Sequence, residues 1–284
     1  MIKKCFIVCF ALFAFTSMHA QANLLNAKAV DQIGKKSDEK IAADNDGPLA
    51  YGYIDDRDIL WSKVVWEFID LNQKINLPFY FPIDTTNISS NRRSLFDTLL
   101  KAIKSGEIGE AYADSFFTTK ITQEEINSRL VNVRETNGFS DTYRISTQDV
   151  AGYMIKGMWY FDKRQGELKY RLLALAPMGR DVQTLGVEGV EDQTLFELFW
   201  VFFPSARETL HNAKIFNPEN ASQPISFDHL LNARRFNSVI VREENIYGNR
   251  SIADYVRGNS LFQLLEADRI KEEIRNKEMD MWNY

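Results

Sequence analysis

The first strong hydrophobic pattern of the chain lies between Asp55 and Ile75. Its apolar residues recur at the spacing of one helical face: Trp61, Val64, Val65, Phe68, Leu71 and Ile75. Three further apolar residues widen this stripe: Leu60, Trp66 and Ile69. Asp55 or Asp56 can cap the start of a helix, and Pro78 and Pro82 prevent its continuation. The pattern therefore predicts a helix over Asp55 to Ile75, buried on more than one side.

Several later segments carry helical signals. Asn91 to Ser105 has one apolar face; Asn91 can cap it, and Gly106 can take the left-handed conformation that closes it. Thr122 has Glu125 three residues later, which is the capping-box pattern that opens a helix. Shorter elements are predicted further on: helices from Pro204 through Leu210, over Ser226 to Arg235 and over Ser251 to Arg257, and a short strand over Ser238 to Arg242.

The last segment, from Leu261 to about Met281, has one apolar stripe among charged residues. The stripe consists of Leu264, Ala267, Ile270, Ile274 and Met281. The pattern favours a helix docked on its own domain. The alternative is a protruding amphipathic helix that binds a partner.

The middle of the chain has a different period. Tyr153 to Phe161 and Leu168 to Ala176 are apolar, aromatic-rich runs joined by a five-residue connection that contains Gly166, so they predict a β-hairpin. A third run, Leu195 to Phe203, ends at Pro204 and is apolar on both faces apart from Glu197. We expect a strand there that is covered on both faces, because strict alternation is missing.

These elements predict a single α+β domain, a small antiparallel sheet packed by several helices, over residues 51–284. The segment 23–50 is small, polar and charged without sustained periodicity, and it is predicted to be a flexible leader. We find no internal repeat and no convincing linker after Asp55.

The first 22 residues have the order of a secretory signal peptide. Lys3 and Lys4 precede an apolar run from Cys5 to Phe15, and small residues follow, with cleavage predicted after Ala22 or alternatively after Ala20. A retained membrane anchor would need about 20 apolar residues, more than this run supplies. Both cysteines lie at the start and middle of the run, not at its end, which argues against a lipoprotein signal.

Composition and charge exclude several classes of protein. The 284 residues are 26% charged and 45% hydrophobic, which is typical of a globular protein. Removal of Lys3 and Lys4 with the signal changes the formal charge from −5 to −7, so nucleic acid is not an expected partner. The mature chain also loses both cysteines, which excludes disulfides, thiolate metal sites and cysteine nucleophiles.

Catalytic signatures are mostly absent from the sequence. It has no nucleophile elbow, phosphate-binding loop, dinucleotide fingerprint or zinc-protease motif. His211 and His229 are the histidines of the mature chain, and a structural role is favoured for each. We therefore assign no catalytic, cofactor-binding or metal-binding residue and no cofactor, and expect the protein not to be an enzyme.

The remaining charged and aromatic clusters have ordinary structural explanations. Asp55, Asp56 and Asp58 fit the capping of a helix start. The pairs Glu243-Glu244 and Glu272-Glu273 are expected on solvated faces. The same holds for Arg92-Arg93 and Arg234-Arg235, with ion pairs or an interface as the alternative. Core packing is the commoner explanation for any one tryptophan, although the set suits interface anchors: Trp61, Trp66, Trp159, Trp200 and Trp282.

Several blocks of the sequence resemble the GldN/PorN family of gliding-motility and type IX secretion proteins. The longest block runs from Asp58 to Trp66 and continues to Pro82. Further matches follow along the chain: Trp159 to Asp162, Ala174 to Pro177, Glu197 to Trp200, Phe203 to Arg207 and Phe236 to Ser238. The resemblance covers about Tyr51 to Tyr255.

The resemblance implies a periplasmic structural subunit of the type IX translocon, peripheral to the outer membrane and required for protein secretion and gliding. Its implied partners are the outer-membrane lipoprotein GldK/PorK, with which it assembles into a ring of many copies, and the periplasmic part of the inner-membrane motor subunit GldM/PorM. The family has no catalytic residues to carry over.

Two other classes compete with this expectation. A periplasmic glycan- or peptidoglycan-binding module would be monomeric and would be retained on cell-wall sacculi without the lipoprotein. A carboxylate hydrolase would lose an activity when His211, His229 and the clustered acids are replaced. For the ring subunit, we expect the C-terminal helix to contribute neighbour contacts, so that deletion after Leu261 weakens assembly and leaves the monomer folded.

Overall fold

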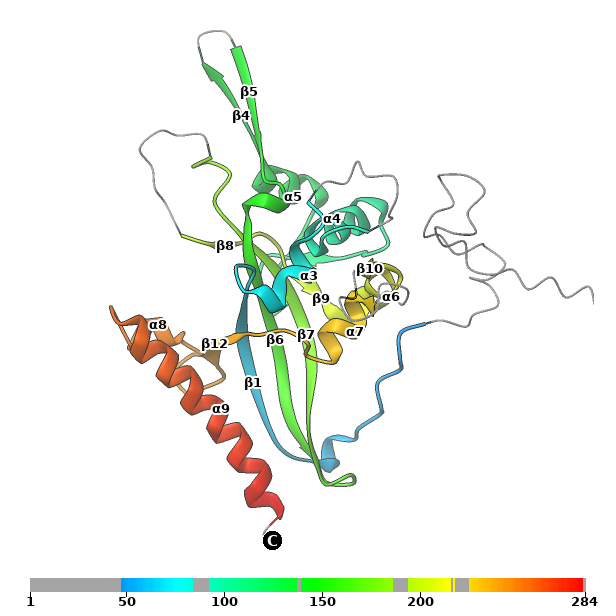
Figure 1. Cartoon of the computed structure of the whole chain (residues 1–284), viewed down its shortest axis with the longest axis vertical. Helices are drawn as coiled ribbons and strands as arrows, with labels where there is room; N and C mark the ends of the chain where they lie inside the picture. Colours follow the sequence, from blue (N-terminus) through cyan, green and yellow to red (C-terminus); the bar gives the residue numbers. More distant parts are fainter. Residues whose placement is uncertain are drawn as a thin grey trace, which may run out of the picture. The chain divides into compact units, whose positions relative to one another are not determined.

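The computed structural model describes residues 47–83, 92–136, 139–185, 194–215, 217 and 225–282 (Figure 1). The predicted signal peptide, the leader up to residue 46 and the predicted cap Asn91 lie outside the described residues.

The fold is built on a six-stranded antiparallel sheet with the order β12-β1-β6-β7-β8, in which β9 also pairs with β7. Its strands are β1 (Ile59–Asp70), β6 (Val150–Asp162), β7 (Glu167–Gly179), β8 (Phe196–Glu197), β9 (Val201–Phe202) and β12 (Val239–Glu243). Three two-stranded ribbons accompany it: β2 (Ala111–Tyr112) with β3 (Lys120–Ile121), β4 (Val131–Thr136) with β5 (Phe139–Arg144), and β10 (Lys214–Ile215) with β11 (Ile225–Ser226).

Helices complete the domain. They are α3 (Leu77–Tyr80), α4 (Leu95–Ser105), α5 (Gln123–Leu130), α6 (Phe203–Asn212), α7 (Phe227–Asn232), α8 (Ile252–Tyr255) and α9 (Ser260–Trp282), with short 3-10 turns η2 (Asp56–Asp58), η3 (Lys74–Asn76) and η4 (Thr147–Asp149). The mixture of helices with an antiparallel sheet confirms the predicted α+β class.

The prediction of a helix over Asp55 to Ile75 is wrong, because this segment forms β1. The strand pairs with β6 along its length and with β12 along its second half. Both faces of β1 are covered, so successive residues such as Val65 and Trp66 are both buried. A strand that is covered twice has a continuous apolar run, and such a run also satisfies helical spacing. Asp55 does cap, but it caps the 3-10 turn η2.

The predicted hairpin is confirmed by β6 and β7, which are longer than expected. Gly157 of β6 lies where a side chain has no space, since a Cβ there would meet the Tyr170 hydroxyl at 2.0 Å. The register of the two strands shifts between Lys156 and Gly157. The glycine therefore allows the Tyr170 ring of β7 to cross its neighbouring strand.

The helix-end signals are mostly confirmed. Thr122 and Glu125 form the reciprocal capping box at the start of α5. Gly106 ends α4 in the left-handed conformation, with φ of 80°. Ser94, not Asn91, supplies the cap of α4, because its hydroxyl accepts from the Asp97 amide.

The prediction of one strand over Leu195 to Phe203 is wrong. This run forms β8 and β9, and α6 already begins at Phe203. Between them Trp200 exchanges two backbone hydrogen bonds of 2.8 Å with Tyr112, which interrupts the pairing with β7. Pro204 then occupies the first turn of α6, where its missing amide costs nothing.

The sheet is covered on both faces, and the buried residues of the described ranges form three clusters. The largest packs α3, α4, α6 and α7 against the sheet around Phe79, Phe96 and Tyr153. A second joins the sheet to α9, and a third surrounds Trp66 and Trp200. Trp61 and Trp159 are partly buried against the second cluster, so these four tryptophans belong mainly to the core.

An ion pair between buried Glu67 and partly buried Arg234 joins β1 to the chain before β12. The Arg234 guanidinium donates to both oxygens of Glu67, at 3.1 and 2.7 Å, and the Ser238 hydroxyl donates to the same carboxylate. Glu67 is 1% exposed. The prediction of a solvated surface is therefore wrong for Arg234, which forms an ion pair. Arg93 also forms an ion pair, with Asp97 at 2.6 Å.

The chain just before η2 is held against α6 and α7 by Tyr51. The Arg207 guanidinium lies 4.1 Å from the centre of the Tyr51 ring, and the Arg171 guanidinium lies 4.7 Å from it. The Tyr51 hydroxyl donates to Asn232 Oδ1 at 2.8 Å. Arg207 is itself fixed by Asp228, which accepts from it at 2.8 and 3.2 Å. Tyr51 is thus held by cation–π contacts of its ring with two guanidinium groups and by a hydrogen bond from its hydroxyl.

Replacing Tyr51 by alanine is expected to free the chain around Leu49 and Gly52, whose carbonyls accept hydrogen bonds from the same two arginines. Loss of the stacking and the hydrogen bond should raise the rate of protease cleavage there about tenfold. Tyr53→Ala is the matched control, since Tyr53 is 85% exposed and should leave the rate unchanged. Equal cleavage rates in the two variants would contradict this role of Tyr51.

Candidate interaction surface

Helix α9 is docked on the sheet through a narrow buried stripe. Ala267, Ile270 and Ile274 pack on β12 and β1 in the second hydrophobic cluster, together with Val65 and Ile240. The favoured interpretation of the C-terminal pattern, a helix docked on its own domain, is therefore confirmed for α9. The stripe begins later than predicted, because Leu264 is 48% exposed.

Polar contacts fix α9 as well. Lys63 of β1 reaches the carboxylates of Glu243 and Glu273, at 2.7 and 2.9 Å. Lys271 donates to the Ser238 carbonyl at 3.0 Å. The expectation of a solvated face is wrong for Glu243, whose side chain is 15% exposed, and holds only in part for Glu273, whose side chain is 40% exposed. The fold brings one glutamate of each acidic pair to Lys63, a long-range contact that sequence spacing does not reveal.

Truncation at Leu261 would therefore remove more than a contact surface. Without α9, the buried side chains of Val65, Ile240 and Ile252 would face water. The expectation that the truncated monomer stays folded is replaced by one of lost stability, since uncovering each large apolar side chain costs about 1.5 to 3 kcal/mol. Point substitutions on the exposed side of α9 separate binding from folding better than truncation does.

The Lys63 contacts make the attachment of α9 dependent on pH. The hydrogen bond from Lys63 lowers the pKa of Glu273 below its ordinary value of 4.5. Burial opposes the charge of Lys63, but its hydrogen bonds to Glu243 and Glu273 raise the pKa of that ammonium above 10.5. Stability from the Glu273 contact is present above pH 4.5 and lost as the pH falls, while that from Lys63 is present below pH 10.5 and lost as the pH rises.

Lys63→Met is expected to lower the melting temperature at about pH 7, and its effect should shrink as the pH falls below 4.5, where Glu273 is progressively protonated. Thermal melts across this range measure the difference. Lys271→Met is the matched control, because its acceptor is a backbone carbonyl that does not titrate. A stability difference for Lys63→Met that stays constant over the range would contradict the assignment.

The first turns of α9 expose four large apolar side chains, which we call the α9 ledge. They are Leu261, Phe262, Leu264 and Leu265, at 62, 58, 48 and 54% exposure. Of these, the predicted stripe included only Leu264. The signal was present, because at about 100° per residue these four positions spread over about 160° of the helix, on the side opposite Ala267, Ile270 and Ile274.

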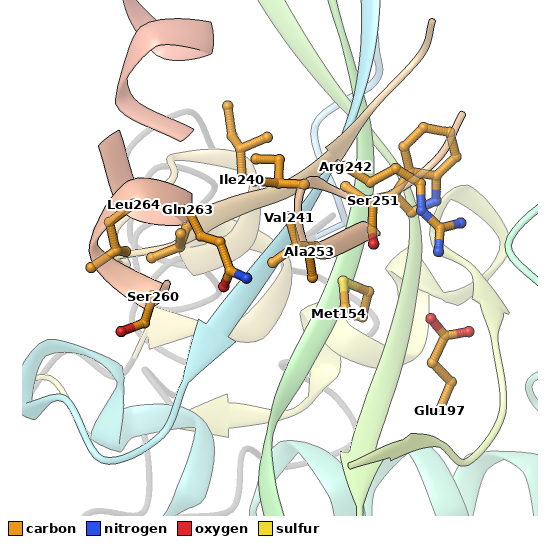
Figure 2. A pocket seen from close by; sticks show the side chains of 13 residues that line it. Met154, Glu197, Ile240, Val241, Arg242, Ser251, Ala253, Ser260, Gln263 and Leu264 are labelled. Carbon is orange, nitrogen blue, oxygen red and sulfur yellow. The ribbon is translucent and has the colours of Figure 1, made fainter. Parts of the chain in front are cut away.

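A groove of about 450 Å³ lies beside the α9 ledge. As Figure 2 shows, Leu264, Gln263 and Ser260 of α9 form one end, and Glu197 and Arg242 lie toward the other. Its remaining lining comes from β1, β6, β12 and α8: Trp66, Met154, Val239, Ile240, Val241, Ser251, Ile252 and Ala253. The groove is thus mainly apolar, with charged side chains at the end away from α9.

Both charged side chains at that end are held in place. Glu197 accepts from the Trp200 indole at 2.6 Å, and the Arg242 guanidinium lies 5.5 Å from the centre of a Trp66 ring. Helices α8 and α9, which both contribute to the lining, are joined where the Tyr255 hydroxyl of α8 donates to Glu266 of α9 at 3.2 Å. Burial and the Glu266 carboxylate raise the pKa of Tyr255 to about 12. Because α8 is tied to α9 in this way, the groove is part of the folded domain.

The structure does not bring the discussed catalytic candidates into one site. His211 lies in the last turn of α6, and His229 is exposed on α7. Asp55 pairs with Arg57, and its pKa is lowered by that hydrogen bond. In the described ranges, no three His, Cys, Asp or Glu side chains are grouped so that they could hold a metal ion. Every helix in those ranges is too short or too polar to cross a bilayer.

A family model identifies the chain. The model of the gliding motility associated protein GldN matches residues 54–283, which include the whole sheet, the groove and the α9 ledge. No curated protein matches the chain. The match covers most of the sequence and agrees with the resemblance of the Asp58 to Pro82 block. The chain therefore belongs to the GldN family of gliding motility associated proteins.

Proposed function

We propose that this protein is a periplasmic structural subunit of the type IX secretion and gliding machinery. In this proposal it forms a ring with an outer-membrane lipoprotein of the GldK/PorK kind and contacts the periplasmic part of the GldM/PorM motor subunit. The observation that carries the proposal is the match to the gliding motility family over residues 54–283. The signal-peptide pattern of residues 1–22 supports an exported location.

The surface of the domain supports a role in assembly. The α9 ledge exposes four large apolar side chains beside a mainly apolar groove. Contiguous exposed apolar area of this kind marks interaction sites in soluble domains. The protein then acts by binding other chains and transmitting load, and not by catalysis.

Gene deletion followed by complementation tests the proposal. Loss of the gene should abolish colony spreading and the secretion of type IX cargo, and the full-length chain should restore both. Fractionation should recover the mature chain from the periplasmic side of the outer membrane, and a tagged chain should co-purify with the lipoprotein. Intact spreading and secretion in the deletion strain would refute the proposal.

A binding assay with cell-wall sacculi separates this function from the glycan-binding alternative. Purified mature chain is mixed with cell-wall sacculi in the absence and presence of the lipoprotein. A ring subunit should stay in the supernatant when the lipoprotein is absent. Saturable retention of the chain alone would favour the binding module.

A further inference from the structure

The α9 ledge has a defined chemical character that continues along the helix. Asp268 follows Leu264 and Leu265 at four- and three-residue spacing, so it lies on the same side of α9. It is exposed. The apolar surface of the ledge is therefore extended by a carboxylate one turn further on.

The charge of Asp268 is not compensated within the described residues. Neighbouring basic groups of α9 have acceptors elsewhere: Arg269 pairs with Glu266 and Glu273, and Arg275 lies 3.7 Å from Glu272. Lys271 donates to a backbone carbonyl. Asp268 has no ion pair or hydrogen bond in the part of the chain that the structure describes. The exposed side of α9 thus offers apolar contacts followed by unpaired negative charge.

We propose that the α9 ledge and its groove bind an amphipathic helix of a different protein that carries a lysine or arginine one turn beyond its apolar residues. Apolar side chains of that helix cover Leu261 and Leu265 and enter the groove beside Leu264, and its cation lies opposite Asp268. This inference rests on the proposed function, because it requires the chain to work within an assembly. It adds the chemical character of one partner.

Charge favours such a partner over a second copy of this chain. The sequence has a formal charge of −5, and two copies of α9 paired in parallel register would bring Asp268 toward Asp268 of the other copy. A basic amphipathic helix meets the same surface with attraction at both its apolar and its charged positions.

Photo-crosslinking in the living source bacterium tests the inference. A photoreactive phenylalanine analogue replaces Leu264 or Leu265 in the full chain, and the matched control carries it at Asn276, which is exposed on α9 beyond the ledge. After illumination, the crosslinked peptide is identified by mass spectrometry. We expect the two ledge positions, and not the control, to label one segment of another protein with apolar residues at helical spacing and a basic residue one turn away.

Substitutions then test the two halves of the surface. Leu265→Asp should lower the yield of the crosslink from position 264 more than about tenfold, since it places a charge in the apolar contact. Asp268→Lys should lower it roughly two- to fivefold, and replacing the partner's basic residue by glutamate should restore it. Unchanged thermal melting of both variants shows that the domain remains folded.

Labelling of this chain itself, of a second copy or of lipid would overturn the inference, as would an absence of labelling at both ledge positions. These outcomes differ from failure of the proposed function. A strain that needs the gene for spreading but shows no ledge crosslink refutes only the inference. A strain that spreads without the gene refutes the proposed function whatever the ledge binds.

Discussion

Ile270→Asp is expected to release α9 from the sheet and to destabilise the domain more than any other single change considered for this helix. Ile270 is 0% exposed and packs in the cluster with Val65 and Ile240. An unpaired carboxylate in this cluster should lower the free energy of unfolding by about 4 kcal/mol or more. For a domain of this size, this corresponds to a fall in melting temperature of roughly 8 to 16 °C.

Leu265→Asp is the control for this substitution. It introduces the same side chain on the same helix, but at a position that is 54% exposed. Its effect on the melting temperature should stay within about 2 °C, because surface substitutions rarely exceed about 0.5 kcal/mol. Similar melting temperatures for the two variants would show that α9 is not docked through the Ile270 stripe.

Glu67→Ala is expected to have the second large effect. It removes the carboxylate that accepts two hydrogen bonds from Arg234 and leaves that guanidinium uncompensated between β1 and the chain before β12. Loss of one partner of a fully buried ion pair costs about 3 to 5 kcal/mol, and because the Arg234 side chain is 26% exposed we expect the free energy of unfolding to fall by about 2 to 4 kcal/mol. Thermal or urea unfolding measures the change.

Two further variants decide whether the loss comes from the stranded charge. Replacing Glu67 and Arg234 together by leucine should recover much of the stability, since no unpaired buried charge remains. Asp97→Ala breaks the ion pair with Arg93, in which the Asp97 side chain is 31% exposed and the Arg93 side chain 33% exposed. This substitution should lower the free energy of unfolding by no more than about 1 kcal/mol. A double variant as unstable as Glu67→Ala would refute the role of the stranded arginine.

The sequence predicted the local features of this fold well. Capping at Thr122, closure at Gly106 and the hairpin around Gly166 depend on residues that are adjacent in the chain, and the structure contains all three. The buried stripe of α9 was also predictable, because Ala267, Ile270 and Ile274 recur at helical spacing.

The failures have a common physical origin in long-range contacts. Nothing near β1 reveals that packed layers cover both of its faces, and a doubly covered strand then resembles a helix in spacing. Likewise, Lys63 meets Glu243 and Glu273 across 180 and 210 residues of chain (243 − 63 and 273 − 63), and Glu67 meets Arg234 across 167. Such pairs looked like solvated charge when each segment was considered alone.

The α9 ledge lies between these two cases. Its apolar residues were visible in the sequence, but which of them face the sheet depends on how the helix docks. The structure assigns Ile270 to the sheet and Leu261, Phe262 and Leu265 to the surface. The sequence therefore showed that α9 has more apolar residues than one docked stripe buries, but it did not show which of them are exposed.

Isolation of the tagged, chromosomally expressed chain from the cell envelope, followed by electron microscopy of the particles, tests the central claim most directly. The account predicts ring-shaped particles in which this chain and an outer-membrane lipoprotein are both present in many copies. Recovery of the chain only as a solitary molecule, lighter than the 32.8 kDa of the full sequence because the signal peptide is removed, from cells that are spreading and secreting normally, would contradict it.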